Sequence, residues 1–187
     1  MYEKGDSMKA IKHFFTITKH RHMVRKYCFK SGLYWQGLVH DLSKYSFSEF
    51  IPSVKYYSGK RSPIGLERRD LGYSYTWLHH KGRNKHHPEY WIDLSLETNS
   101  YQPIEMPDKY VGESFCDHLA ASKVYNKKDF KPQMVLDYYY NKEKFVLPLH
   151  INTQKKLELL LNLYIEKGEK EVFKYIKKNY RKKNKNG

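Results

Sequence analysis

The fold of this chain is decided by the stretch MKAIKHFFTITKHRHMVRKYCFK at residues 8–30, followed by Ser31-Gly32 and then LYWQGLVHDL at residues 33–42. Apolar residues recur in its first part at intervals of three and four, Ile17 and Val24 among them, which predicts an amphipathic helix. Ser31-Gly32 supplies a stop, with the glycine as a left-handed cap. The stretch therefore predicts an antiparallel pair of helices joined by a tight turn.

The remainder of the chain also carries helical signals. Ser46-Phe47-Ser48-Glu49 has the spacing of a capping box, and Ser62-Pro63 has the features of a helix start. We find no period-two alternation between hairpin turns. We expect helices at about 46–59, 62–80, 107–125, 132–142, 153–167 and 169–180, a short piece at 88–94 and a loop at 97–107. These signals predict an all-α fold.

Length and composition favour a single domain. The chain has 187 residues, 40% of them apolar, which is enough to bury a core. We expect one domain over 1–187, with a metal-binding core at about 8–125 and additional C-terminal helices at about 126–180. A frayed basic tail is expected at 181–187.

Several protein classes are excluded by the same sequence. Cys28 and Cys116 lie far apart and outside any C-x-x-C pair, which excludes a cysteine-based zinc site or a disulfide framework. The N-terminal MYEKGDS leads into no signal-peptide core, and no apolar run approaches the length of a membrane-spanning helix. We therefore expect a cytoplasmic protein without membrane contact.

The histidines are unevenly placed, and two of them are predicted to meet across the first helix pair. His20 shares a helical face with Ile17 and Val24, so its ring should point inward. The chain runs roughly 15 Å from His20 to the turn and roughly 11 Å back to His40, at about 1.5 Å per residue. His20 should therefore lie near His40 and its neighbour Asp41.

Two further segments can contribute to the same site. Asp117 lies on an apolar helical face, where an ionised carboxylate is costly unless it is paired or bound to metal. The string WLHHKGRNKHHPEYW at 77–91 holds two histidine pairs around a basic turn. One ligand from each pair can face a common ion. The candidate metal ligands are His20, His40, Asp41, His79, His80, His86, His87 and Asp117.

This set favours a dinuclear centre. Nitrogen and carboxylate ligands suit Fe, Mn, Co, Ni or Zn, and six or more ligands exceed the needs of one structural zinc. They would suit two divalent ions bridged by Asp41. A lone histidine on a helix is more often packed or exposed than a ligand, so the prediction rests on the combination. The spacing leaves open which member of each histidine pair, His79 or His80 and His86 or His87, is the ligand.

The order of these residues resembles the HD-domain superfamily, and H-D-L-S-K at 40–44 is similar to its characteristic segment. The resemblance covers roughly residues 8–125, and implies an HD-like helical bundle. The strings CFKSGLY, QGLVHDLSKYS and WLHHKGRNKHH are also similar to a family of small uncharacterised bacterial proteins, which implies no reaction.

The superfamily consists mostly of metal-dependent phosphohydrolases acting on nucleotides and related phosphoesters. The resemblance implies that Asp41 bridges two ions and that Lys44 binds the phosphate or the nucleophile. It implies that Lys81, Arg83 and Lys85 attract a small anionic substrate, although a solvated turn is an equal alternative. A minority branch with a rich ligand set consists of di-iron oxygenases, so the ligands leave hydrolase and oxygenase open.

The net charge of +15, from 35 basic and 20 acidic residues, supports a third alternative. Clustered positive charge is typical of nucleic-acid-binding proteins, in which case the metal would be structural. Lysine-rich solvated surface is the competing interpretation. An amphipathic stripe at Lys155–Tyr164 is expected to pack in the core, with a homodimer interface as the alternative.

Overall fold

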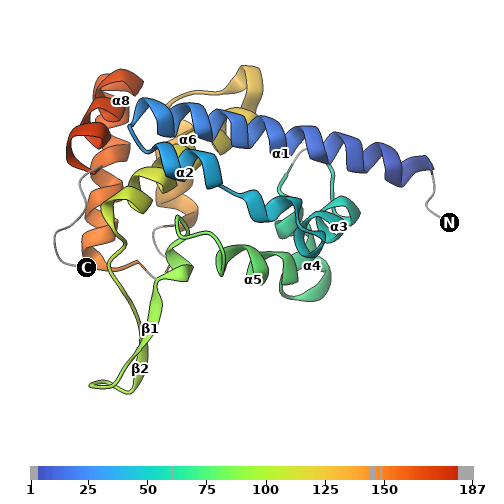
Figure 1. Ribbon diagram of the computed structural model, residues 1–187, viewed down its shortest axis with the longest axis horizontal. Helices are drawn as coiled ribbons and strands as arrows, with labels where there is room; N and C mark the ends of the chain where they lie inside the picture. The colour runs from blue at the N-terminus through green and yellow to red at the C-terminus, as the bar shows by residue number, and fades with distance from the viewer. Residues whose placement is uncertain (1–3, 60, 144–145, 148, 181–187) are drawn as a thin grey trace.

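The computed structural model describes residues 4–59, 61–143, 146–147 and 149–180, and over these the chain is helical apart from one small hairpin (Figure 1). The prediction of an all-α fold is confirmed. The expected basic tail at 181–187 lies outside the described residues. Within the described part, no helix combines the length and apolar character needed to cross a membrane.

The predicted helix pair is present as α1 (Lys4–Lys30) and α2 (Tyr34–Val39). Gly32 takes the expected left-handed conformation, with φ of 72°. Helix α2 is shorter than expected because His40 leaves the helical conformation, with ψ of 124°, and Asp41 is left-handed, with φ of 53°. A short 3₁₀ turn, η1 (Leu42–Tyr45), follows. The His-Asp dipeptide therefore lies in a sharp bend rather than in a helix.

The next segments correct three expectations. Helix α3 (Phe47–Lys55) ends before Gly59, and the capping box is absent because Ser46 makes no side-chain cap and Glu49 binds histidines instead. The single helix expected at 62–80 is two helices, α4 (Pro63–Leu71) and α5 (Tyr75–Lys81). Gly72, with φ of 81°, ends α4, and the Ser74 side chain caps α5 by accepting from the Trp77 amide.

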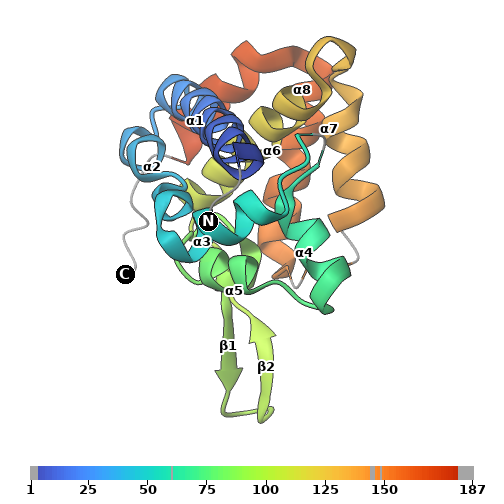
Figure 2. The ribbon, with the colours of Figure 1, turned by 90° about the vertical axis from the view of Figure 1, so that its right-hand side faces the viewer.

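A β-hairpin occupies the region where only a short piece and a loop were expected. After the 3₁₀ turn η2 (Pro88–Tyr90), β1 (Ile92–Ser95) pairs antiparallel with β2 (Ser100–Pro103). Asn99 takes a positive φ of 47° at the tip. The hairpin projects from the helical body (Figure 2). The strands are short and largely exposed, so they carry little of the apolar alternation that signals a strand.

The second half of the molecule is built on two long helices, α6 (Asp108–Asn126) and α8 (Ile151–Asn179). Between them lie η3 (Lys127–Asp129), α7 (Gln133–Tyr138) and a π turn, η4 (Tyr139–Glu143). As predicted, Gly168 separates two helical segments: it breaks α8 with φ of 77°. Helix α1 packs against α2, α3, α6 and α8.

The main apolar core fills the space between α1, α6 and α8. Its fully buried members include Val24, Phe115 and Leu161. The stripe at Lys155–Tyr164 contributes Leu157, Leu160, Leu161 and Tyr164 to this core, as expected. His20 precedes Val24 by one turn, and Asp117 follows Phe115 by two residues, so the core holds both candidate ligands at its edge.

Replacing Gly37 by alanine should loosen the contact between α1 and α2. A Cβ at this position would lie 2.9 Å from the Cys28 Cβ and 3.3 Å from the Arg25 Cα. Forcing a methyl group into such a contact costs about 1–3 kcal/mol of unfolding free energy. Urea unfolding measures this loss.

The matched control is Gly65→Ala in α4. A Cβ there meets nothing within 4 Å. Alanine is preferred over glycine in a helix by about 0.5–1 kcal/mol, so this variant should keep or gain stability. Equal stability of the two variants would contradict the close approach of α2 to α1.

Candidate metal centre

Asp41 occupies the middle of the candidate site. It is completely buried, and the bend between α2 and η1 turns it inward. Its left-handed backbone is one that aspartate adopts more readily than most residues. The two carboxylate oxygens of Asp41 face different histidines, which is the arrangement that a bridging ligand needs.

The first group of ligand atoms surrounds Asp41 Oδ2. His20 Nε2 lies 3.7 Å from this oxygen and His40 Nε2 lies 3.3 Å from it. Asp117 Oδ1, from α6, lies 3.0 Å from His20 Nε2 and 3.7 Å from His40 Nε2. One ligand atom from each of these four residues lies within 4.8 Å of the others, so the group could hold a metal ion. The predicted meeting of His20, His40 and Asp41 is confirmed.

The second group surrounds Asp41 Oδ1. His80 Nε2 lies 3.3 Å and His86 Nε2 3.5 Å from this oxygen. His87 joins them, with its Nε2 3.0 Å from His80 Nε2. Asp41 and the three histidines form another set whose ligand atoms lie within 4.8 Å of one another. Asn84 shapes the turn between the histidine pairs, because its side chain donates to the His80 carbonyl and to Ser43.

Glu113 is a part of the site that the sequence analysis missed. Its Oε1 lies 2.9 Å from His40 Nδ1 and 3.2 Å from His86 Nδ1. Glu113, His40 and His86 form the third group whose ligand atoms lie within 4.8 Å of one another. Such a carboxylate fixes the ring orientation and leaves Nε2 free to bind metal. Glu113 lies one turn before Asp117 on α6, and this i, i+4 spacing is the signal that could have identified it.

Glu49 has the same role for the second histidine cluster and was also missed. Its Oε1 lies 2.7 Å from His79 Nδ1, and its Oε2 lies 2.8 Å from His80 Nδ1. His80 directs its Nε2 to Asp41, whereas His79 is in none of the three groups of metal-capable atoms found among the described residues. The structure therefore distinguishes the pair: His80 lies in the ligand set, and His79 lies outside it against Glu49.

Several inward-facing atoms lack a hydrogen bond, and this pattern bears on whether the residues fit a metal. The buried His20 Nε2, His40 Nε2, His86 Nε2 and Asp41 Oδ1 have no partner of good geometry within the described residues. Buried polar groups are nearly always satisfied, and these atoms converge on shared points. Imidazole nitrogens and carboxylate oxygens of this kind fit a divalent transition metal.

The carboxylates of the site favour positively charged groups at its centre. Burial opposes ionisation of Asp41 and Asp117, but the neighbouring histidines, joined by Lys44 at Asp41, hold both pKa values well below normal. Burial lowers the pKa of His40 and of His86, but the surrounding carboxylates outweigh it and raise both, that of His86 to about 9. Without metal, protons on these rings balance the carboxylates.

Lys44 completes the predicted catalytic pair with Asp41. Its Nζ lies 2.5 Å from Asp41 Oδ2. Burial lowers the pKa of Lys44, but the Asp41 and Asp117 carboxylates more than offset this effect, so its pKa is raised and the amine is a cation. Lys44 is therefore a fixed positive charge at the edge of the first ligand group.

The basic turn is less closely tied to the site. Arg83 and Lys85 are exposed: the Arg83 side chain donates to the His79 carbonyl, and Lys85 lies over the Tyr90 ring. Lys81 is half-buried at the end of α5. Within the described residues, no hydrogen bond or ion pair joins these three side chains to the ligand groups, so their role toward a substrate stays a prediction.

The metal-free protein should lose stability as the pH rises from about 6.5 to about 9. Histidine in an unfolded chain has a pKa of about 6.5, whereas folding raises the pKa of His40 and raises that of His86 to about 9. The protons on these rings stabilise the fold fully below pH 6.5, and this stabilisation is lost as the pH climbs through the folded values. Urea unfolding in EDTA at both pH values measures the change.

Metal loading provides the control for this pH dependence. A bound ion takes the place of the protons, so the loss of stability over the same range should shrink when metal is present. An unfolding free energy that rises with pH in EDTA would contradict the charge balance described for His40 and His86.

The fold and the site together define a helical protein with buried His/Asp/Glu groups that could hold a metal ion. Residues 9–163 match a family of unknown function, DUF5662. The match covers most of the chain, and the chain belongs to this family. No curated protein and no solved structure matches it.

Proposed function

We propose that this protein is a metal-dependent phosphohydrolase of the HD superfamily, acting on a nucleotide or a small phosphorylated metabolite. The observation that supports the proposal is the pair of ligand groups that share Asp41, with the Lys44 ammonium beside the shared carboxylate. The order His20, His40-Asp41, His80, His86 and Asp117 adds the resemblance to that superfamily.

The residues divide between two divalent ions. His20, His40, Asp41 and Asp117 would hold one, and Asp41, His80, His86 and His87 would hold the other. Such ions polarise a phosphoryl group and lower the pKa of water, which is the chemistry that phosphoester hydrolysis needs. Glu113 and Glu49 keep the histidine rings oriented for this task.

Lys44 would act on the substrate rather than on the metal. Its ammonium is held by Asp41 and can donate hydrogen bonds to a phosphoryl oxygen, stabilising the negative charge that grows during the reaction. Lys81, Arg83 and Lys85 would attract the anion from solution.

A di-iron oxygenase is the second candidate. It is favoured by the number of imidazoles, because five of the candidate ligands in the two groups are histidines and such nitrogen-rich sites also suit iron. In this case the same residues would bind two iron ions, and O₂ would be a substrate.

The metal content and the turnover of one preparation separate these candidates. We expect protein loaded with Mn, Co or Ni to hydrolyse members of a phosphomonoester panel, and Lys44→Met to reduce kcat by about 100-fold, a typical value for one charge-stabilising donor, while keeping its metal. Elemental analysis verifies metal retention. Stable iron, an O₂-dependent visible absorption and no phosphate release would favour the oxygenase instead.

A further inference from the structure

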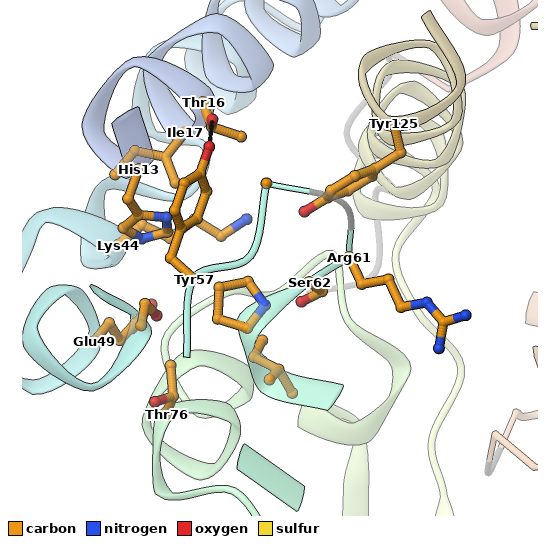
Figure 3. A pocket seen from close by; sticks show the side chains of 14 residues that line it. His13, Thr16, Ile17, Lys44, Glu49, Tyr57, Arg61, Ser62, Thr76 and Tyr125 are labelled. Carbon is orange, nitrogen blue, oxygen red and sulfur yellow. Dashed lines mark hydrogen bonds between the residues drawn. The ribbon is translucent and has the colours of Figure 1, made fainter. Parts of the chain in front are cut away.

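A small cavity lies beside the metal centre and is shown in Figure 3. Its walls come from α1, η1, α3, α5, α6 and the segment that runs from the end of α3 into the start of α4, and its volume is about 60 Å³. Tyr57 and Tyr125 contribute ring surfaces, and Ile17, Pro63 and Ile64 add apolar surface. Tyr57 is held in place by a hydroxyl contact of 2.8 Å with Thr16.

Lys44 connects this cavity to the metal centre. The side chain lines the cavity and its amine reaches toward the middle in Figure 3, while the same amine lies 2.5 Å from Asp41 Oδ2. Glu49 also lines the cavity and binds His80 from the other side. A phosphoryl group bound at the metal centre and by Lys44 would therefore lie next to this cavity.

Two residues that line the cavity, His13 and Thr76, each carry a buried polar atom that a ligand hydroxyl group could satisfy. Within the described residues, His13 Nδ1 and Thr76 Oγ1 have no hydrogen-bond partner, although the residues are only 4% and 3% exposed. Buried polar atoms of this kind are costly unless they are satisfied. Burial, aided by the Lys44 cation, lowers the pKa of His13 to about 4, so its ring is neutral and can bind a hydroxyl group.

The size of the cavity restricts the ligand. One water needs about 10–15 Å³ of cavity volume. The cavity volume of 60 Å³ therefore accommodates about four to six water-sized groups. A chain of three carbons with its hydroxyl groups fits this limit. A nucleoside, with its base and ribose, is several times larger.

We propose that this cavity binds the alcohol part of a compact, hydroxylated phosphomonoester, and that the substrate is a small polyol phosphate rather than a nucleotide. The inference rests on the proposed function. In the reaction the oxygen of water forms a bond to phosphorus, the ester P–O bond breaks, and the alcohol leaves with a proton from that water. His13 and Thr76 bind the hydroxyl groups, and Lys44 binds the phosphoryl end.

Calorimetric titration of Mn-loaded protein with two phosphonates tests the proposal. The ligands are the analogues of glycerol 3-phosphate and of adenosine monophosphate in which CH₂ replaces the ester oxygen, so neither is hydrolysed and binding is measured without turnover. We expect the glycerol analogue to bind at least about tenfold more tightly. Equal or tighter binding of the adenosine analogue, or no binding of the glycerol analogue, would overturn the proposal.

Two variants locate the binding in the cavity. Ile64→Trp fills it and should weaken binding of the glycerol analogue by about tenfold or more. Ile104→Trp makes the same change at a 39% exposed position outside the cavity and should leave binding unchanged.

Thr76→Val removes one unsatisfied hydroxyl without filling space and should weaken binding about threefold to tenfold, which keeps the test decisive if Ile64→Trp does not fold. Unchanged binding in folded Ile64→Trp or in Thr76→Val would overturn the assignment.

The same titration separates this inference from the proposed function. Preferred binding of the glycerol analogue, together with no hydrolysis of any phosphomonoester, would overturn the hydrolase and leave the cavity assignment standing. Hydrolysis of phosphomonoesters together with tighter binding of the adenosine analogue would overturn the cavity assignment alone.

Discussion

Replacing Asp41 with asparagine is expected to abolish binding of the two proposed metal ions while preserving the helical fold. Asp41 supplies an oxygen to each ligand group, so its loss affects both. Asparagine has the same shape and tolerates the left-handed backbone at this position. Losing a shared ligand should reduce metal affinity by more than the roughly 10–100-fold that loss of an orienting residue costs.

Elemental analysis and circular dichroism of the purified variant measure these two expectations. His79→Gln is the matched control, because His79 neighbours His80 but lies outside the ligand groups of the described residues, and it should retain its metal. His20→Ala changes only the first group and should remove one ion of two. An Asp41→Asn variant with the metal content of the wild type would contradict the site.

Replacing Glu113 with glutamine should weaken metal binding by about 10–100-fold without removing any of the proposed ligands. The Glu113 carboxylate holds Nδ1 of His40, which belongs to the first ligand group, and Nδ1 of His86, which belongs to the second. A neutral amide supports the two rings less well and does not raise the basicity of their Nε2 atoms. In the proposed centre, Glu113 is thus a positioning residue for both ligand groups.

Competition with a metal-sensitive dye measures the affinity of this variant, and ¹⁵N spectra of the histidine rings report the protonated nitrogen of His40 and His86. Glu105→Gln is the control, because Glu105 pairs with Lys156 and Asn152 away from the centre. Unchanged affinity and ring spectra in Glu113→Gln would show that the carboxylate orients neither ring.

The first helix pair and its histidines could be predicted from the sequence because they depend on local signals. Periodicity placed His20 on the inner face, Gly32 set the turn, and the count of residues brought His40 and Asp41 to the same level. The apolar face of α6 identified Asp117. Each of these signals acts within one or two elements of the chain.

The supporting carboxylates were missed because their role depends on contacts between distant elements. Glu49 was interpreted as a capping residue, but its carboxylate reaches across to α5 and binds His79 and His80. Glu113 gives no local sign of its two histidine partners. Choosing between His79 and His80 likewise required the position of α5 relative to Asp41, which periodicity alone does not supply.

Two parts of the fold were mispredicted for different reasons. Gly72 and Ser74 carry the signals that end α4 and begin α5, but the apolar spacing across them favoured a single helix. The hairpin β1–β2 projects from the body and buries little apolar surface, so alternation was too weak to reveal it.

The left-handed backbone of Asp41 restricts which substitutions can persist at this position during evolution. A side chain other than asparagine, aspartate or glycine pays about 1–2 kcal/mol for the conformation before any question of metal arises. Glutamate keeps the carboxylate but loses this tolerance. In a saturation mutagenesis library, asparagine and glycine should therefore be the substitutions that keep the fold but lose the proposed metal binding, because the backbone conformation restricts this position independently of the ligand chemistry.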